Sequence, residues 1–238
     1  MALIEYVALV ILGGLALAWE AWAPGQGGVV EPLTMLFWVL ANMLGELLWL
    51  PSPRQRGYLS MATAANFATL LVLPVWQAVM VTVVAGALVD MIFRHKRWYQ
   101  VLFNASVCCI AVFSASRVFT AVGQGRDGLE TLLSPLNVWA LLLSAVTYFL
   151  LNTWLVSGVV AMDQRVAACS VWTTSFASRR EILGSLVLFV LGLLFAVLFL
   201  AWGYMSAFLA TIATYFVREA YSRYVTSQDA TAFPLGAA

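Results

Sequence analysis

The sequence has few charged residues, one histidine, one lysine and three cysteines. Only 10% of its 238 residues are charged and 63% are hydrophobic, whereas soluble proteins are about 25% charged and about 45–50% apolar. With a formal net charge of +1, the chain offers no basic surface for nucleic acid. The apolar excess runs along the whole chain, which predicts a polytopic membrane protein rather than a soluble domain with one anchor.

The scarce residue types also argue against most familiar catalytic and cofactor sites. His95 lies in a basic stretch, so no apolar segment carries a histidine for haem and no Ser-His-Asp set is present. Lys96 also lies outside the apolar segments, which excludes a retinal Schiff base. Cys108, Cys109 and Cys169 have no spacing suited to zinc. We therefore expect no enzymatic activity, no metal and no cofactor.

About eight apolar segments approach the length of about 20 residues that a helix needs to cross a bilayer. They cover residues 2–22, 32–51, 59–73, 75–93, 98–122, 136–162, 181–202 and 205–222. The third is short and Leu73-Pro74 joins it directly to the fourth, so these two form either a tight helical hairpin or a re-entrant pair. We predict an all-α transmembrane bundle of seven or eight spans over residues 1–225, followed by a disordered tail at 226–238.

Basic residues are distributed unevenly over the loops of this map. Of the 12 basic residues, all but Arg117 and Arg126 fall in one alternating set of loops. That set contains Arg54, Arg56, Arg94, Lys96, Arg97, Arg165, Arg179, Arg180, Arg218 and Arg223. Because cytoplasmic loops are enriched in Lys and Arg, both termini are predicted to be cytoplasmic, in a bacterial inner membrane. The densest group, Arg94, Lys96 and Arg97, is expected to hold anionic lipid headgroups.

The segment 164–180 is too polar to cross the membrane. Val166, Cys169, Trp172 and Phe176 recur in it at near-helical spacing. This pattern predicts a helix that lies in the cytoplasmic interface with its apolar side against the lipid.

Four asparagines lie on four different apolar segments. They are Asn42, Asn66, Asn104 and Asn152, and a rise of about 1.5 Å per residue puts them about 9–16 Å from the cytoplasmic ends. An unpaired amide in hydrocarbon is costly. The four amides therefore either hydrogen-bond between helices and hold the bundle together, or line a polar pocket that opens toward the cytoplasm and binds a small or amphipathic ligand.

Two carboxylates lie close to this layer. Glu46 is the deepest acidic residue in the sequence, and it either pairs with a loop arginine such as Arg54 or belongs to the pocket. Asp90 precedes Arg94 by four residues, a spacing that permits an ion pair on one helix face.

Several short fragments follow one another in a recognisable order and spacing. They are Glu46, Gly57-Tyr58-Leu59-Ser60, Leu73-Pro74, Asp90 with Arg94–Arg97, Trp98, Leu102-Phe103-Asn104-Ala105 and Tyr148-Phe149-Leu150-Leu151-Asn152-Thr153. In these fragments the chain resembles the polytopic membrane domain that precedes GGDEF or HD-type output domains in bacterial signalling proteins. That domain is itself loosely similar to the substrate-binding S components of energy-coupling-factor transporters. The resemblance implies a sensory or ligand-binding module, with recurrent polar positions at Glu46, Ser60, Asp90, Asn104 and Asn152.

Four functions remain open from the sequence. The first is a membrane sensor or binding module that takes a small or lipophilic ligand into the polar pocket and, because no output domain is recognisable, acts through a partner. The second is an accessory or structural subunit of a larger membrane complex. The third is a transporter component, and the last is an intramembrane enzyme with Glu46 or Asp90 as acid or base. Membrane lipids and a protein partner or second copy are the expected partners.

Overall fold

The chain is helical almost throughout the part that the computed structural model describes, which is residues 2–22, 31–51, 58–125 and 128–206 with scattered residues from 209 to 223. The helices are α1 (Ala2–Trp22), α2 (Pro32–Leu47), α3 (Ala62–Val72), α4 (Val75–Ile92), α5 (Trp98–Val122), α6 (Leu129–Leu132), α7 (Pro135–Gln164), α8 (Ala168–Ser175) and α9 (Arg179–Trp202). A short 3₁₀ turn, η1 (Gly203–Met205), follows α9. The prediction of an all-α bundle is confirmed.

The strands in the described ranges, β1 (Trp49–Pro51) and β2 (Tyr58–Ser60), pair antiparallel as a small hairpin. This hairpin shortens the two helices beside it. The apolar segment at 32–51 gives a helix of 16 residues, and the segment at 59–73 gives one of 11. Five other helices, α1, α4, α5, α7 and α9, are long and apolar enough to cross a membrane. Hydropathy alone therefore overstates the lengths of α2 and α3, because it does not detect that β1 and β2, which lie between these helices in the chain, pair as strands.

Leu73-Pro74 separates α3 from α4 without an intervening loop. Proline has no backbone N–H and disfavours helical geometry in the residue before it, so α3 ends at Val72 and α4 begins at Val75 with Pro74 as its N-cap. The predicted last span at 205–222, the tail at 226–238 and the loop residues Arg54, Arg56 and Arg126 lie largely or wholly outside the described residues.

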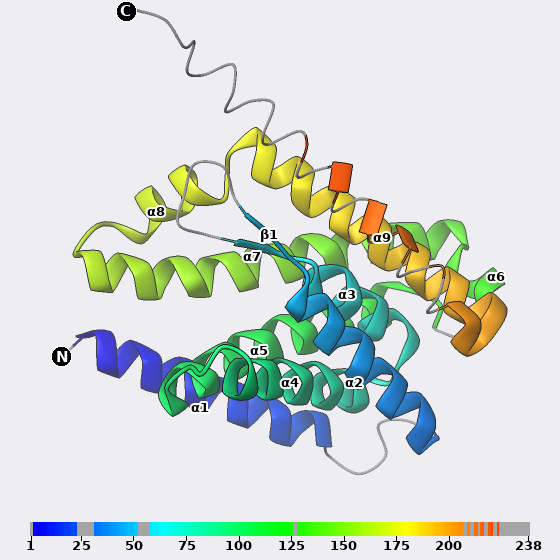
Figure 1. Cartoon of the computed structure of the whole chain (residues 1–238), viewed down its shortest axis with the longest axis horizontal. Coiled ribbons are helices and arrows are strands. Elements are labelled where there is room, and N and C mark those ends of the chain that lie inside the picture. Colours follow the sequence, from blue (N-terminus) through cyan, green and yellow to red (C-terminus); the bar gives the residue numbers. More distant parts are fainter. Residues whose placement is uncertain are drawn as a thin grey trace, which may run out of the picture.

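The core of the bundle is built around α3 and α5. Helix α5 packs against α1, α4 and α7, and α3 packs against α2, α4, α5 and α9. Figure 1 shows α1 along one side of the bundle and α9 along the opposite side, with α8 and the N-terminus at the left and α6 at the right. Most side chains of the short helix α3 are buried. Helix α3 is therefore an internal helix that packs between α9 on one side and α2, α4 and α5 on the other.

Glycines allow the neighbours of α3 to approach it closely. A Cβ atom at Gly192 of α9 would lie 2.6 Å from the carbonyl oxygen of Ala64, and one at Gly45 of α2 would lie 3.0 Å from the Cα of Ala62. Small residues at helix contacts let backbones pack closely in membrane proteins. The positions of α2 and α9 on α3 thus depend on the absence of a side chain at these two sites.

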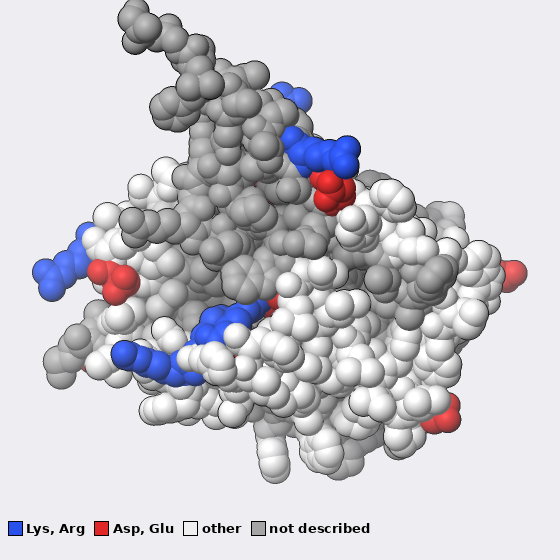
Figure 2. Space-filling model, in the orientation of Figure 1, with Lys and Arg blue, Asp and Glu red and all other residues white. Residues whose placement is uncertain are grey.

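Five of the described basic residues lie in helix connections or at a helix start, whereas Arg117 lies within α5. Arg94, Lys96 and Arg97 lie between α4 and α5, Arg165 lies between α7 and α8, and Arg179 begins α9. On the face seen in Figure 2, Lys and Arg side chains gather in the centre, at the left and at the top, whereas the right side shows acidic side chains alone. The uneven charge distribution agrees with the predicted orientation, and the cytoplasmic assignment stays a prediction.

The polar segment after α7 forms the short helix α8. Its Trp172 ring stacks on Trp154 of α7 with centroids 5.4 Å apart and planes 11° apart. The indole N–H of Trp172 donates to the hydroxyl of Thr153 at 2.9 Å. Helix α8 is thus attached to α7 through one aromatic side chain, and its location in the membrane interface stays a prediction.

The glycine contacts predict a difference between two otherwise similar substitutions. Gly192→Ala places a methyl group against a backbone oxygen that cannot move freely, so we expect the free energy of unfolding to fall by about 1–3 kcal/mol. Gly86 of α4 is a matched control, because a Cβ atom there has nothing within 4 Å. Gly86→Ala should leave stability unchanged or raise it by up to about 1 kcal/mol through helix propensity. Reversible unfolding in mixed detergent micelles measures both, and equal losses would contradict the packing described here.

Candidate functional site

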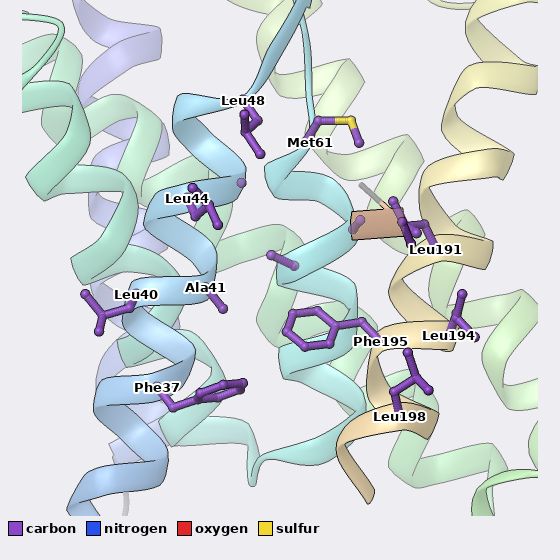
Figure 3. Close-up of a pocket in the computed structure, with 14 residues that line it drawn as sticks. Phe37, Leu40, Ala41, Leu44, Leu48, Met61, Leu191, Leu194, Phe195 and Leu198 are labelled. Atoms are coloured by element: carbon purple, nitrogen blue, oxygen red, sulfur yellow. The ribbon is translucent and has the colours of Figure 1, made fainter. Parts of the chain in front are cut away.

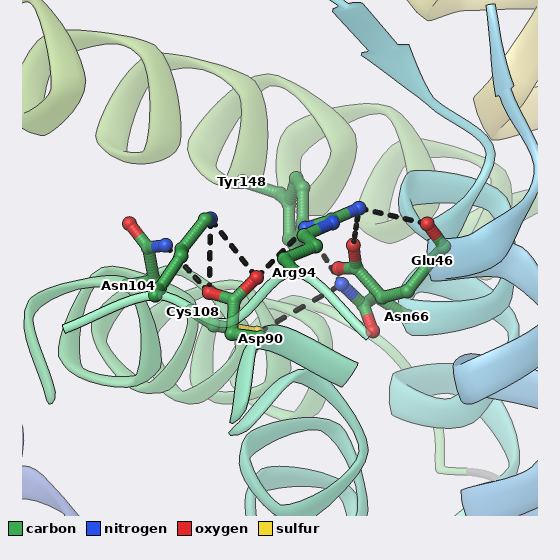
Figure 4. Close-up of polar contacts among 8 residues, drawn as sticks. Glu46, Asn66, Asp90, Arg94, Asn104, Cys108 and Tyr148 are labelled. Carbon is green, nitrogen blue, oxygen red and sulfur yellow. Dashed lines mark hydrogen bonds and ion pairs between the residues drawn. The ribbon is translucent and has the colours of Figure 1, made fainter. Parts of the chain in front are cut away.

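A buried carboxylate at the end of α4 collects three donors. Asp90 is 3% exposed. It accepts hydrogen bonds from Arg94 Nη1 at 2.9 Å, from Lys96 Nζ at 3.0 Å and from Asn104 Nδ2 at 2.6 Å. The i,i+4 spacing between Asp90 and Arg94 therefore does form an ion pair. Figure 4 shows these donors arriving at Asp90 from the connection after α4 and from α5.

Arg94 connects this carboxylate to α2. Its Nη2 donates to Glu46 Oε2 at 2.9 Å and to the backbone carbonyl oxygen of Glu46 at 2.7 Å. The last carbonyls of a helix have no partner within the helix, so one guanidinium both pairs the Glu46 side chain and caps the end of α2. Arg94 therefore pairs with Glu46 in the structure, and Arg54, the loop arginine suggested by the sequence, lies outside the described residues.

The connection between α4 and α5 is folded so that its cations turn inward. The backbone N–H of Lys96 donates to the carbonyl of Asp90 at 3.0 Å, and His95 between them has a positive φ of 48°. Arg94 and Lys96 consequently both reach Asp90. Arg97 is exposed and its guanidinium donates to the Tyr99 hydroxyl at 3.3 Å. Arg94 and Lys96 thus pair with carboxylates of the chain. Lipid-headgroup binding by Arg94, Lys96 and Arg97 stays a prediction.

A polar cavity of about 180 Å³ lies against this network. Its polar lining comes from five helices and from the connection after α4, which contributes Arg94. Helix α2 contributes Glu46, α3 contributes Thr63 and Asn66, and α4 contributes Thr82 and Asp90. Helix α5 contributes Asn104 and Cys108, and α7 contributes Tyr148 and Asn152. Charged groups and neutral hydrogen-bonding groups thus share the wall of one cavity.

The neutral groups of the lining are only partly paired. Asn66 Nδ2 donates to the Tyr148 hydroxyl at 3.0 Å and lies 3.8 Å from Cys108 Sγ. Asn104 uses its nitrogen on Asp90. Asn152 makes no hydrogen bond to another described residue, although it lies on the cavity wall. The cavity therefore presents amide groups that are available to a bound molecule.

The structure brings four of the five predicted ligand-binding residues together. Glu46, Asn66, Asn104 and Asn152 all line the polar cavity. Asn42 does not: its amide nitrogen donates to the Trp38 carbonyl and to the Thr69 hydroxyl, both at 2.8 Å, in the interior between α2 and α3. Asn42 is therefore an interhelical contact, which is the alternative that the sequence left open. Ser60, suggested by the resemblance, lies in β2.

Sequence reasoning missed Thr82, Cys108 and Tyr148 as lining residues. Two of them lie one helical turn from a predicted residue: Tyr148 precedes Asn152 by four residues, and Cys108 follows Asn104 by four. Thr82 and Asp90 are separated by eight residues, two turns of α4. The signal that would have found them is the 3.6-residue period of polar and small residues within apolar segments.

A second hollow of about 280 Å³ lies on the other side of α3. It is lined by apolar side chains of α2 and α9, with α3 between these helices, as Figure 3 shows. Phe37 and Leu44 of α2 face Leu194 and Phe195 of α9 across it. No described lining residue carries a charge or an amide, so this groove lacks the chemistry of the polar cavity.

Comparisons with known proteins give one family. The model of MASE9, a family of membrane-associated sensor domains, matches residues 58–226, which is more than half of the chain. The match begins at β2 and includes the cavity lining from α3, α4, α5 and α7. No curated protein and no solved structure matches the chain.

The Asp90 network predicts a large effect of one neutral substitution. Asp90→Asn removes the charge that pairs with Arg94 and Lys96 and leaves both cations partly buried, so we expect unfolding free energy to fall by about 3 kcal/mol or more. Glu219→Gln is the matched control, because Glu219 also pairs with an arginine four residues on, Arg223, but is 45% exposed. Its loss should stay below about 1 kcal/mol. The same detergent unfolding assay compares them, and similar small losses would show that the buried network contributes little.

Proposed function

This chain belongs to the MASE9 family of membrane-associated sensor domains, and we propose that it senses a small molecule bound in the polar cavity and passes the signal to a partner protein. The membrane is proposed to be the bacterial inner membrane, with the cavity opening toward the cytoplasm. This placement fits the kind of membrane domain that the sequence resembles, one that works with GGDEF or HD-type output domains.

The observation that supports a sensor best is the composition of the cavity wall. Glu46, Asn66, Asp90, Asn104 and Asn152 come from five different helices. A ligand that contacts them interacts with α2, α3, α4, α5 and α7 at once. Any ligand with different affinity for two arrangements of these helices shifts the equilibrium between them.

The ion-pair network provides a route from the cavity to the surface. Arg94 and Glu46 both line the cavity, and Arg94 also caps the end of α2 directly before the β hairpin. A molecule that alters the Arg94–Glu46 contact changes how firmly the end of α2 is held. We therefore propose that a partner protein binds at the surface formed by the hairpin of β1 and β2.

A second function, an accessory subunit of a membrane complex, has one observation in its favour. Only 11% of the apolar stretch of α1 is buried within the chain. Leu9, Leu12 and Trp19 are more than half exposed on this helix. Such a face suits contact with lipid or with another membrane helix. A transporter component has no comparable support from the described residues.

The sensor proposal is tested by ligand-dependent stability. We expect a low-molecular-weight fraction of bacterial cytosol to raise the unfolding temperature of the purified protein in nanodiscs. Asn152→Leu should abolish this shift without lowering the basal unfolding temperature, because the Asn152 amide bonds to no other described residue. Asn42→Leu is the control in the interior between α2 and α3, away from the cavity wall, and it should lower basal stability while keeping the shift.

The outcomes separate the two functions. A shift that survives in Asn152→Leu and also in Gly86→Leu would place the ligand outside the cavity and contradict the proposal. Absence of any shift, together with purification in a fixed ratio with other membrane subunits, would favour the accessory function.

A further inference from the structure

Within the part of the chain that the structure describes, the charged groups beside the polar cavity cancel one another. Two carboxylates, Glu46 and Asp90, are matched by two cations, Arg94 and Lys96, through contacts of 2.9 Å. An entering anion meets both carboxylates, and an entering cation meets the guanidinium and the ammonium. Because these four described charges offer no net attraction, neither ion recovers the hydration that it loses on entering the cavity.

The groups left for recognition are uncharged. Asn104 and Asn66 use their amide nitrogens on Asp90 and Tyr148, which leaves the carbonyl oxygen of each without a bond to another described residue. Neither the nitrogen nor the oxygen of the Asn152 amide bonds to another described residue, and Asn152 lines the cavity. Amide oxygens accept and amide nitrogens donate hydrogen bonds, so the available partners suit a molecule that carries hydroxyl or amide groups.

Helix α3 separates the polar cavity from the apolar groove, which would otherwise take the acyl chain of a lipid-like ligand. The cavity lies against Thr63 and Asn66 of α3, whereas the apolar groove lies against Ala64 and Ala65 of the same helix. Beside them α2 and α3 are nearly in backbone contact, since a Cβ at Gly45 would lie 3.0 Å from Ala62 Cα. An acyl chain therefore cannot extend from the amides into the groove.

The size of the cavity limits the ligand further. Sites for drug-sized ligands enclose about 300–1,000 Å³, and this cavity has about 180 Å³. A molecule held wholly within this volume is therefore smaller than a drug-sized ligand.

We infer that the polar cavity selects a small, uncharged molecule rich in hydroxyl or amide groups, and that it rejects ions and lipids. The inference rests on the proposed sensor function and narrows its ligand. The recognising groups are the amides of Asn66, Asn104 and Asn152, and the ion pairs of Arg94 hold the cavity without attracting charge.

Cys108 provides a probe of this selectivity, because it lies on the cavity wall. In the full chain carrying Cys109→Ala and Cys169→Ala, it is the remaining cysteine. The protein in nanodiscs is treated with four methanethiosulfonates that carry hydroxyethyl, aminoethyl, sulfonatoethyl or decyl groups. Intact mass gives each labelling rate, and each rate is divided by that of the same reagent on the denatured protein.

The hydroxyethyl reagent should label Cys108 at least about tenfold faster than the two charged reagents, which lose hydration on entry. It should also label faster than the decyl reagent. Gly86→Leu fills open space on the cavity wall, since a Cβ at Gly86 meets nothing within 4 Å, and should slow hydroxyethyl labelling about tenfold. Gly86→Ala is the size control and should slow it less.

Three results would overturn the inference: equal rates for charged and uncharged reagents, fastest labelling by the decyl reagent, or hydroxyethyl labelling that Gly86→Leu leaves unchanged. Failure of every reagent to label the folded protein would also overturn it. The outcome is separable from the sensor proposal, because labelling needs no natural ligand. Selective labelling without a stability shift from the cytosolic fraction would reject sensing and retain the selectivity of the cavity.

Discussion

The pairing of Arg94 with two carboxylates is the interaction on which the site depends. A guanidinium placed between Asp90 and Glu46 joins the end of α4 to the end of α2, and Lys96 and Asn104 complete the shell around Asp90. Buried charges are costly unless they are paired and hydrogen-bonded. Their complete pairing lets a charged network lie at the edge of an otherwise apolar bundle, and it supports a cavity whose remaining polar groups are neutral.

Helix α3 imposes the second constraint. It is short and rich in alanine, and α2 and α9 approach it closely through glycine contacts. One side of α3 carries Thr63 and Asn66 toward the polar cavity, and another carries Ala64 and Ala65 toward the apolar groove. Because α3 lines both the polar cavity and the apolar groove, a displacement of α3 at one of them also changes the wall of the other.

Sequence reasoning located the site better than it described its contacts. Glu46, Asn66, Asn104 and Asn152 were predicted from depth and polarity, and the structure places all four on one cavity. Asn42 met the same criteria but faces Trp38 and Thr69, because depth along a helix does not specify rotation about its axis. The sequence position of Arg94 in a basic loop likewise does not show that its guanidinium reaches both Asp90 and Glu46.

The sequence by itself determined the helical class, the positions of most helices and the identity of the polar groups that need partners. These features follow from local hydropathy and from the cost of burying amides and charges. Only the tertiary structure decided that a β hairpin shortens α2 and α3, that Arg94 pairs with Glu46, and which amides share a cavity. Those outcomes depend on contacts between residues far apart in the chain. The rotation of each helix about its own axis determines which of its side chains make those contacts.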